Sequence, residues 1–287
     1  MNIMKFRPLF LIISSILLIS SLLSIVFWGF KPSIDFVGGA VWEIDFPSAP
    51  ENSKIEEIFI ANNIKNLVIS KNDTRYKLEF KDISSDEKIA LDEEITKLDE
   101  DYQELKFETL GPSLGKELFQ KTIVAIILSC TALLLFISYR FKDFHFGISA
   151  IIALIHDSIV LIGSFSILGH FFGAELNSLF VTALLTTLSL SVYDTVVIFD
   201  RIREIKNQNY KLDWKEITNK SIVESLTRSI NTSATTIFTL AALVVLGGET
   251  TRWFSTALLI GITCGTYSSI GVAIPLVLFF KKHQQRK

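Results

Sequence analysis

The sequence predicts an α-helical polytopic membrane protein with six transmembrane helices and a small ferredoxin-like α+β domain inserted between the first two. Hydrophobic residues make up 49% of the 287-residue chain and charged residues only 20%, a composition too apolar for an ordinary soluble protein. Six apolar runs reach or approach the ~20 residues that a bilayer-spanning helix needs. Residues 31–121 are instead polar and acidic, with 20 Asp and Glu against 12 Lys and Arg.

The apolar runs define the expected membrane helices. They cover residues 9–29, 122–139, 147–169, 176–199, 229–246 and 254–280. The first run is long and no Ala-x-Ala-like cleavage site follows it. We therefore interpret residues 1–30 as a short tail and an uncleaved first helix rather than a signal peptide.

The distribution of basic residues predicts the orientation. Fifteen Lys and Arg flank the spans on the side of the N-terminus, whereas the two short loops on the other side, 170–175 and 247–253, carry only Arg252. Cytoplasmic flanks are the ones enriched in Lys and Arg. We expect both termini on the cytoplasmic side, residues 31–121 on the outer side of the membrane and residues 281–287 as a basic cytoplasmic tail.

The outer segment, residues 31–121, begins with an alternating strand pattern at 40–46. Residues 52–63 carry Ile55, Ile58 and Phe59 at helical spacing, with Ser53 as a possible cap. These patterns predict a strand followed by a helix.

Two short strands at 67–69 and 76–80 flank a turn at 71–73. A helix is expected over 85–100, with Ile89, Ile95 and Leu98 facing inward, and a last strand over 102–109. The resulting order, β-α-β-β-α-β, is that of the ferredoxin-like split βαβ. Such a domain does not identify a function.

The fourth and fifth spans, within the helical region 122–280, are joined by a predicted cytoplasmic loop at 200–228. Its apolar residues recur at partly helical spacing: Trp214, Ile217, Ile222 and Leu226, with Ile230 beyond it. We expect either a segment lying on the membrane surface or a linker facing water.

Several function classes are excluded by missing motifs. The segment 111–117 has too few residues between its glycines for a phosphate loop, and Glu117 stands where Ser or Thr is needed. No His-Glu-x-x-His or Gly-x-Ser-x-Gly motif occurs. Cys130 and Cys264 have no metal-ligand spacing and are expected to be small buried hydrophobes. We expect no enzymatic site, no cofactor, no metal and no nucleic-acid partner.

Asp194 is the most informative ionisable residue within an apolar run. It lies six residues before Asp200, so about 9 Å inside the charged edge of its helix. A carboxylate at such a depth costs on the order of 2–3 kcal/mol. Thr187 and Ser191 share its helical face, and a carboxylate lined by hydroxyls can hold water and accept a proton.

Arg228 opens the fifth span, with Thr232, Thr235 and Thr239 following on one face. Arg228 and Asp194 are expected in the same half of the membrane. Because arginine stays charged, it would hold Asp194 ionised while close and let it take up a proton when the helices part. The pair predicts a proton relay. Two alternatives remain open: the residues lock helices together, or Arg228 reaches to lipid phosphates.

Two further features are expected to be structural. His156 and Asp157 in the third span predict an interhelical polar contact. Small residues recur in the sixth span and predict a close helix-packing face. They are Ala257, Gly261, Gly265 and Ser269.

Several stretches resemble motifs of the SecD/SecF family of export proteins. The motifs lie at 33–39 (Ser-Ile-Asp-Phe-Val-Gly-Gly), 110–118, 139–141, 153–157, 191–204, 228–233 and 247–249. The segment 191–204, which contains Asp194, is the most specific, and Asp-Phe in the first motif is typical of SecF rather than SecD. Ser33 and Ile205-Lys206 depart from the family pattern without touching the expected relay.

The resemblance implies half of a fold similar to resistance-nodulation-division (RND) transporters, located in a bacterial inner membrane with residues 31–121 periplasmic. It implies a SecD partner, the SecYEG translocon, an unfolded preprotein substrate and, in addition, YajC-like or YidC-like proteins. It also implies that proton motive force is used at the positions matching Asp194 and Arg228 to promote late steps of translocation. Gly38 and Gly39 are expected to serve backbone geometry. Other readings remain: an RND-like small-molecule exporter subunit, or a structural partner of the translocon that conducts no protons.

Overall fold

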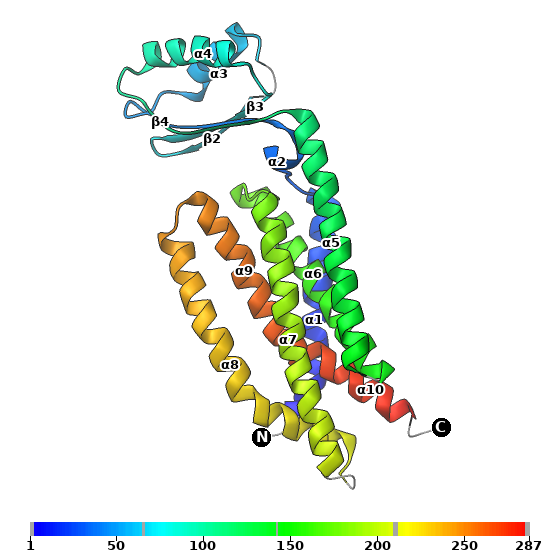
Figure 1. Ribbon diagram of the computed structural model, residues 1–287. Coiled ribbons are helices and arrows are strands. Elements are labelled where there is room, and N and C mark those ends of the chain that lie inside the picture. The colour runs from blue at the N-terminus through cyan, green and yellow to red at the C-terminus, as the bar shows by residue number, and fades with distance from the viewer. Residues whose placement is uncertain (1–2, 65–66, 142, 209–211, 285–287) are drawn as a thin grey trace. The chain divides into compact units, whose positions relative to one another are not determined.

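A computed structural model describes residues 3–64, 67–141, 143–208 and 212–284. The chain forms two compact units (Figure 1). One comprises Pro32–Val124, and the other comprises Met1–Lys31 together with Ala125–Lys287. Residues 285–287 of the expected basic tail lie outside the described residues.

In the described part of the chain, six helical segments are long and apolar enough to cross a membrane, in agreement with the predicted number. They span Ile3–Trp28, Pro112–Arg140, Phe144–Phe172, Ser178–Gln208, Trp214–Leu246 and Thr250–Lys282. The first contains η1 (Ile3–Phe6) and α1 (Arg7–Trp28), and the next four are α5 to α8. The last contains α9 (Glu249–Ser268), a π-turn η2 (Ser269–Ala273) and α10 (Ile274–Gln284).

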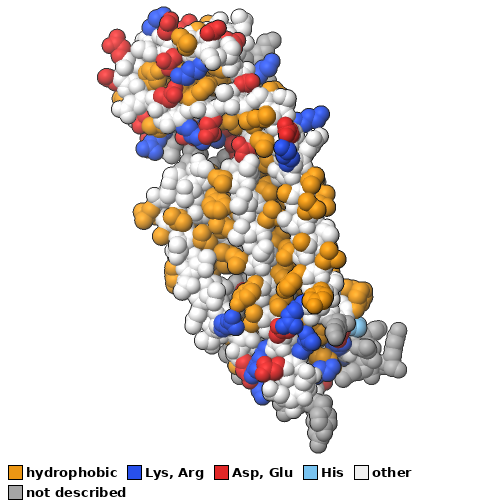
Figure 2. Space-filling view, viewed as in Figure 1, with side chains coloured by type: hydrophobic (Ala, Val, Ile, Leu, Met, Phe, Trp, Pro, Cys, Tyr) orange, Lys and Arg blue, Asp and Glu red, His pale blue; other side chains and the backbone are white. Residues whose placement is uncertain are grey.

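The spans expose apolar side chains along their length and charged ones near an end. Figure 2 shows hydrophobic side chains over the outward faces of the helices, and Lys, Arg, Asp and Glu gathered near the end that carries the N-terminus. Exposed Ile16 and Val26 on α1, and Leu128 and Leu135 on α5, are examples of this lipid-type surface. Such a distribution is typical of helices that face hydrocarbon.

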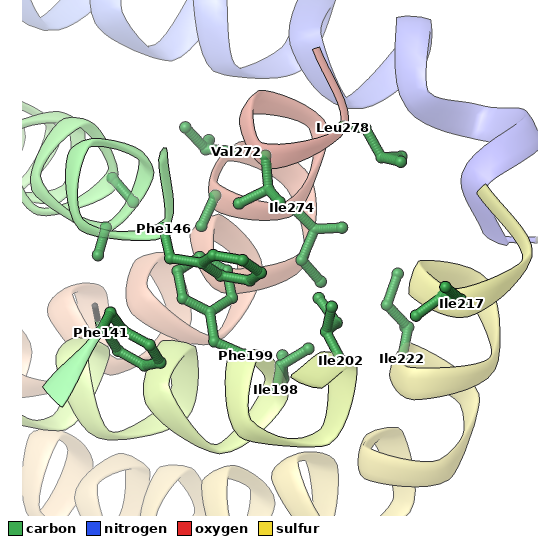
Figure 3. Packing of buried hydrophobic residues seen from close by; sticks show 14 of the residues in the cluster. Phe141, Phe146, Ile198, Phe199, Ile202, Ile217, Ile222, Val272, Ile274 and Leu278 are labelled. Carbon is green, nitrogen blue, oxygen red and sulfur yellow. The ribbon is translucent and has the colours of Figure 1, made fainter. Parts of the chain in front are cut away.

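The largest buried cluster joins the charged ends of the helices (Figure 3). Phe199 of α7 packs edge-to-face on Phe141 and Phe146, with ring centroids 5.5 and 4.9 Å away. Ile217 and Ile222 of α8 belong to the same cluster. Aromatic pairs of this geometry contribute beyond the area that they bury, so this cluster fixes the helix ends.

The segment 200–228, predicted as a loop, is mostly helical. α7 continues to Gln208, and α8 runs without interruption from Trp214 to Leu246. Ile217 and Ile222 are buried against protein, which explains their helical spacing without a lipid surface. Ile230 is 49% exposed. Residues 209–211 lie outside the described part of the chain.

α7 and α9 pack through small residues, as the sequence predicts. A Cβ added at Gly261 would lie 2.4 Å from Thr187, and one added at Gly265 would lie 2.9 Å from Ser191. One turn further, Ser269 and Thr195 share a hydrogen bond of 2.9 Å. Ala257 is fully buried. Because the contact leaves no room for side chains, the two backbones approach closely.

The inserted unit is an antiparallel sheet covered by helices. Its elements follow the predicted order: β1 (Gly39–Asp45), α3 (Asn52–Ala61), β2 (Val68–Asn72), β3 (Arg75–Phe80), α4 (Ser85–Leu98) and β4 (Gln103–Leu110). The strand order is β2-β3-β1-β4, with every pair antiparallel. A short helix, α2 (Ile34–Val37), precedes β1.

The core of this unit lies between the sheet and its two helices. Trp42 and Ile44 of β1 and Tyr76 and Leu78 of β3 alternate inward, as a half-buried sheet requires. Ile55 and Phe59 of α3 are fully buried against them, in agreement with the predicted helical face.

Two details of the helix predictions are wrong. Ser53 lies inside α3, whose cap residue is Glu51, so the hydroxyl caps nothing. Ile89 is 57% exposed, and Leu91 is buried in its place. Leu91, Ile95 and Leu98 follow one another at helical spacing and share a face, whereas Ile89 is six residues before Ile95 and lies on another.

Gly38 and Gly39 lie where only glycine fits. Their φ angles are +75° and +132°, and a Cβ would lie 2.7 Å from Pro112 Cα and from the Phe80 carbonyl oxygen, respectively. Backbone atoms cannot move away far enough to make room for a methyl group at that distance. The two glycines therefore let β1 start directly beside β3 and the start of α5.

We expect Gly39→Ala to destabilise the inserted unit by about 2 kcal/mol or more, because strain at a positive φ adds to the backbone clash. Limited proteolysis of the full chain, with cleavage in 32–124 measured against temperature, reports this. Gly248→Ala is the control, since its Cβ would meet nothing within 4 Å. Equal protection of both variants would contradict the assignment.

We expect Gly261→Ala to destabilise the helical unit by about 1–3 kcal/mol through overpacking against Thr187. Thermal unfolding in detergent measures the loss. Gly147→Ala is the matched control in a membrane helix, because its Cβ would come no closer than 4.0 Å to Ile137. An unchanged midpoint for Gly261→Ala would show that α7 and α9 can separate without loss.

Candidate functional site

Asp194 of α7 borders a small pocket between α7, α8 and α9. The pocket has a volume of about 100 Å³, enough for a few water molecules. Its described lining is Leu190, Ser191, Tyr193, Asp194, Thr232, Ser233, Thr236, Ile262, Gly265 and Thr266. Hydroxyl groups predominate among the polar side chains, so the carboxylate faces groups that donate or accept hydrogen bonds.

The Asp194 carboxylate is half-buried and weakly held. Thr266 Oγ1 donates to its Oδ2 at 3.5 Å, and Thr266 in turn shares a 2.7 Å hydrogen bond with Ser233. The positive charge of Arg228 also acts on the carboxylate. A carboxylate with so few strong partners can change its protonation state without breaking a tight network.

Arg228 of α8 reaches the residue next to Asp194. Its Nη2 donates to the phenolic oxygen of Tyr193 at 2.7 Å. Within the described part of the chain, no ion pair within 4.0 Å joins Arg228 to Asp194. The arginine is exposed and Tyr193 is 50% exposed. Asp194 and Arg228 thus lie on facing helices in the same region, with the tyrosine holding the guanidinium.

Only two of the four hydroxyl residues expected beside Asp194 and Arg228 belong to the described lining of the pocket. Ser191 and Thr232 line the pocket, whereas Thr187 and Thr235 are absent from its described lining. Thr187 is buried against Gly261 on the packing face of α7. Thr235 donates back to its own helix, to the Thr232 carbonyl oxygen at 2.9 Å. Helical spacing alone cannot distinguish a face that lines water from one that packs on a neighbour.

Sequence reasoning missed several lining residues. Thr236 follows Thr232 by one turn, so the spacing could have indicated it. Tyr193 directly precedes Asp194 in the family-like motif. Ser233 and Thr266 carry no local signal, because they depend on how α8 and α9 pack.

A second carboxylate, Asp157 of α6, is 5% exposed and fully hydrogen-bonded. Ser191 and Ser268 donate to its Oδ2 at 2.6 and 2.7 Å. The Cys264 thiol donates to Oδ1 at 3.3 Å, and His156 Nδ1 lies 3.0 Å from the same oxygen. Four partners fill the acceptor capacity of a carboxylate. This is the interhelical contact expected of Asp157, and it includes the adjacent His156 as well.

Among the described residues searched, the His156, Asp157 and Cys264 side chains form a group that could surround a metal ion. Their atoms lie within 4.8 Å of one another, and all three are buried. The carboxylate in this group is already saturated by hydroxyl, thiol and imidazole partners. The hydrogen bonding of the carboxylate is therefore complete, whereas the buried Nε2 of His156 has no hydrogen-bond partner among the described residues.

Ser191 connects the two carboxylates. Its hydroxyl donates to Asp157, and the same residue lines the pocket of Asp194 one turn along α7. The arrangement places a tightly bound carboxylate in the helix core and a loosely bound one beside a pocket. Of the two, Asp194 has the environment suited to exchanging a proton with water.

Comparisons with known proteins agree with this architecture. The sequence model of the family described as "Protein export membrane protein SecD/SecF, C-terminal" matches residues 90–283. The chain is 39% identical to protein translocase subunit SecF of Thermobaculum terrenum, over 94% of this chain and 90% of that protein. It is 35% identical to that of Anaerolinea thermophila, over 100% and 96%.

Solved structures of SecDF match the fold. The crystal structure of SecDF from Thermus thermophilus superposes with a TM-score of 0.88 at 30% identity, covering 98% of this chain. SecDF in its super-membrane-facing form gives 0.73 at 29% identity, covering 100%. This chain spans 39% of each of those longer chains. By sequence over nearly its full length and by fold, this chain belongs to the SecD/SecF family of protein-export membrane proteins, among its SecF subunits.

Proposed function

We propose that this protein is the SecF-type subunit of the Sec export machinery and that proton exchange at Asp194 drives its work on preproteins. It is a multi-pass inner-membrane protein of the transport kind. The observation that carries the proton proposal is the half-buried Asp194 carboxylate, which borders a pocket containing several hydroxyl groups. Arg228 of the facing helix α8 donates to Tyr193, the neighbour of Asp194 on α7.

The proposed step is a proton moving on and off Asp194. While Arg228 lies close, its charge favours the carboxylate form. When α8 moves away from α7, the half-buried carboxylate favours the protonated form, because a lone charge is costly there. Tyr193 holds Arg228 near Asp194 without an ion pair between them, so the ionised and protonated forms of Asp194 stay close in free energy. A proton crossing about 150 mV releases about 3.5 kcal/mol, enough for one modest movement.

The proposed topology follows the charges of the chain. Both termini and the α7–α8 connection lie in the cytoplasm, and residues 31–121 lie in the periplasm. The α+β unit would then act on the preprotein on the far side of the membrane, together with the corresponding part of SecD.

The proposed partners start with SecD. The SecDF structures contain more than this chain, which covers only two fifths of them. A SecD half would supply six further spans in a pseudo-symmetric arrangement and would cover the exposed Arg228. We extend the proposal to SecYEG and an unfolded preprotein, and to YajC-like and YidC-like proteins as additional members.

A small-molecule exporter fits less well. Such an exporter needs large outer domains with an apolar ligand pocket, whereas the inserted unit comprises only Pro32–Val124. The inserted unit has a fully packed core of its own. A structural subunit that conducts no protons is the alternative that the next experiments separate.

We expect Asp194→Asn to reduce export of a secreted reporter at least tenfold, to the level of cells without the protein, because the amide cannot exchange a proton. Pulse-chase processing in cells measures this. Asp200→Asn is the control, since Asp200 lies on the same helix but pairs with Arg140 at its charged end. Assembly is checked by co-purification with SecD. Undiminished, proton-dependent export by an assembled Asp194→Asn protein would refute the relay.

We expect Tyr193→Phe to slow proton flux about fivefold to tenfold, because it removes one hydrogen bond that positions Arg228, worth about 1–1.5 kcal/mol. The flux is measured in proteoliposomes that contain this chain and SecD. Tyr139→Phe is the control, since Tyr139 is 88% exposed. Equal flux in the two variants would mean that the Arg228–Tyr193 contact is only structural.

A further inference from the structure

A second pocket lies at the charged end of the helical unit, away from Asp194. It has a volume of about 420 Å³ and lies where the start of α1, the start of α8 and the end of α10 meet. Its described lining is Met4, Lys5, Arg7, Pro8, Asp213, Trp214, Lys215, Leu278 and Lys282. We call it the basic pocket.

The charge of this pocket is strongly one-sided. Four cations, Lys5, Arg7, Lys215 and Lys282, face one carboxylate, Asp213. Within the described part of the chain, none of the four cations has an ion pair or a side-chain hydrogen bond. Unpaired cations elsewhere on a surface are solvated, but four around one concavity repel one another unless an anion lies between them.

The walls of the basic pocket are partly apolar and are firmly held. The ammonium groups of Lys206 and Lys281 lie over the Trp214 ring, 4.3 and 5.5 Å from its centroid. η1 is fixed to α8, because Asn219 Oδ1 accepts the Ile3 amide at 2.7 Å. Met4, which follows, is buried. The pocket is thus a built feature of packed elements rather than a chance arrangement of surface lysines.

We propose that the basic pocket binds the headgroup of an anionic phospholipid. The phosphodiester would lie among the four cations, and the glycerol and first acyl carbons would lie along Pro8 and Trp214, since Met4 and Leu278 are buried in the neighbouring core cluster. The pocket lies where apolar spans end in charged residues, which is the depth of lipid phosphates. Basic pockets between membrane helices recognise acidic headgroups in this way.

The combination of walls favours a lipid over a free phosphate ion. A soluble anion would use only the cations and would leave the accessible surface of Pro8 and Trp214 facing water. A diacyl phospholipid satisfies both parts at once, and the membrane presents it at high local concentration. This proposal is independent of the proton site, since neither Asp194 nor Arg228 lines the basic pocket.

The test is native mass spectrometry of the full chain in detergent, titrated with phosphatidylglycerol, phosphatidylcholine or sn-glycerol 3-phosphate. We expect specific retention of phosphatidylglycerol. Lys215→Gln/Lys282→Gln should weaken it about 10- to 30-fold, because each basic residue near a lipid phosphate contributes about tenfold or less. Should the double variant not fold, as judged by thermal unfolding, Lys282→Gln alone should weaken binding severalfold.

The control removes equal charge from the same end of the molecule. Arg203→Gln/Lys220→Gln changes two cations that lie near Asp200 and Glu224 and do not line the pocket. It should leave phosphatidylglycerol retention within about twofold. Equal loss in both double variants would reduce the effect to general surface charge and overturn the proposal. Equal retention of phosphatidylcholine, or tight binding of glycerol phosphate alone, would overturn it too.

Discussion

The close approach of α7 and α9 is the contact on which the rest of the membrane unit depends. Gly261 and Gly265 leave space for Thr187 and Ser191, and a methyl group in either place would push the helices apart. The approach brings the Ser191 hydroxyl to Asp157 and places Thr266 beside Asp194. A packing face made of small residues therefore sets the position of both buried acids.

The two acids have opposite environments, although they lie near one another. Asp157 accepts from hydroxyl, thiol and imidazole groups and is almost fully buried, which suits a fixed polar junction of α6, α7 and α9. Asp194 has one long hydrogen bond and borders a pocket. Environments that differ in this way assign different roles to two groups of the same chemistry. The partner subunit proposed for this chain would act on the exposed side, where Arg228 and Tyr193 lie.

Sequence patterns predicted the membrane spans and the inserted fold well, because hydrophobic runs and strand alternation report burial directly. They failed where a helical face was misjudged or where packing decides. The prediction that Ile89 faces inward is wrong, because Leu91 is the residue at helical spacing from Ile95 and so reaches the core. Thr187 shares a helical face with Asp194 and yet packs on Gly261, since only the neighbouring helix decides which part of a face meets water. Thr266 lies on a distant helix and had no local signal at all.

α8 is one continuous helix that contributes both to the basic pocket and to the site at Asp194. Trp214 and Arg228 belong to the same helix, but this helix is not straight. Its first turns, which carry Ile217 and Ile222, run across the direction of α7 (Figure 3), and its later part rises beside α7 and α9 (Figure 1). Because no proline or glycine interrupts this stretch, the helix continues through the change of direction. A shift of its charged end against α1 and α10 therefore acts on the guanidinium through one continuous helix, and the surroundings of that end help to set how readily the arginine leaves its tyrosine.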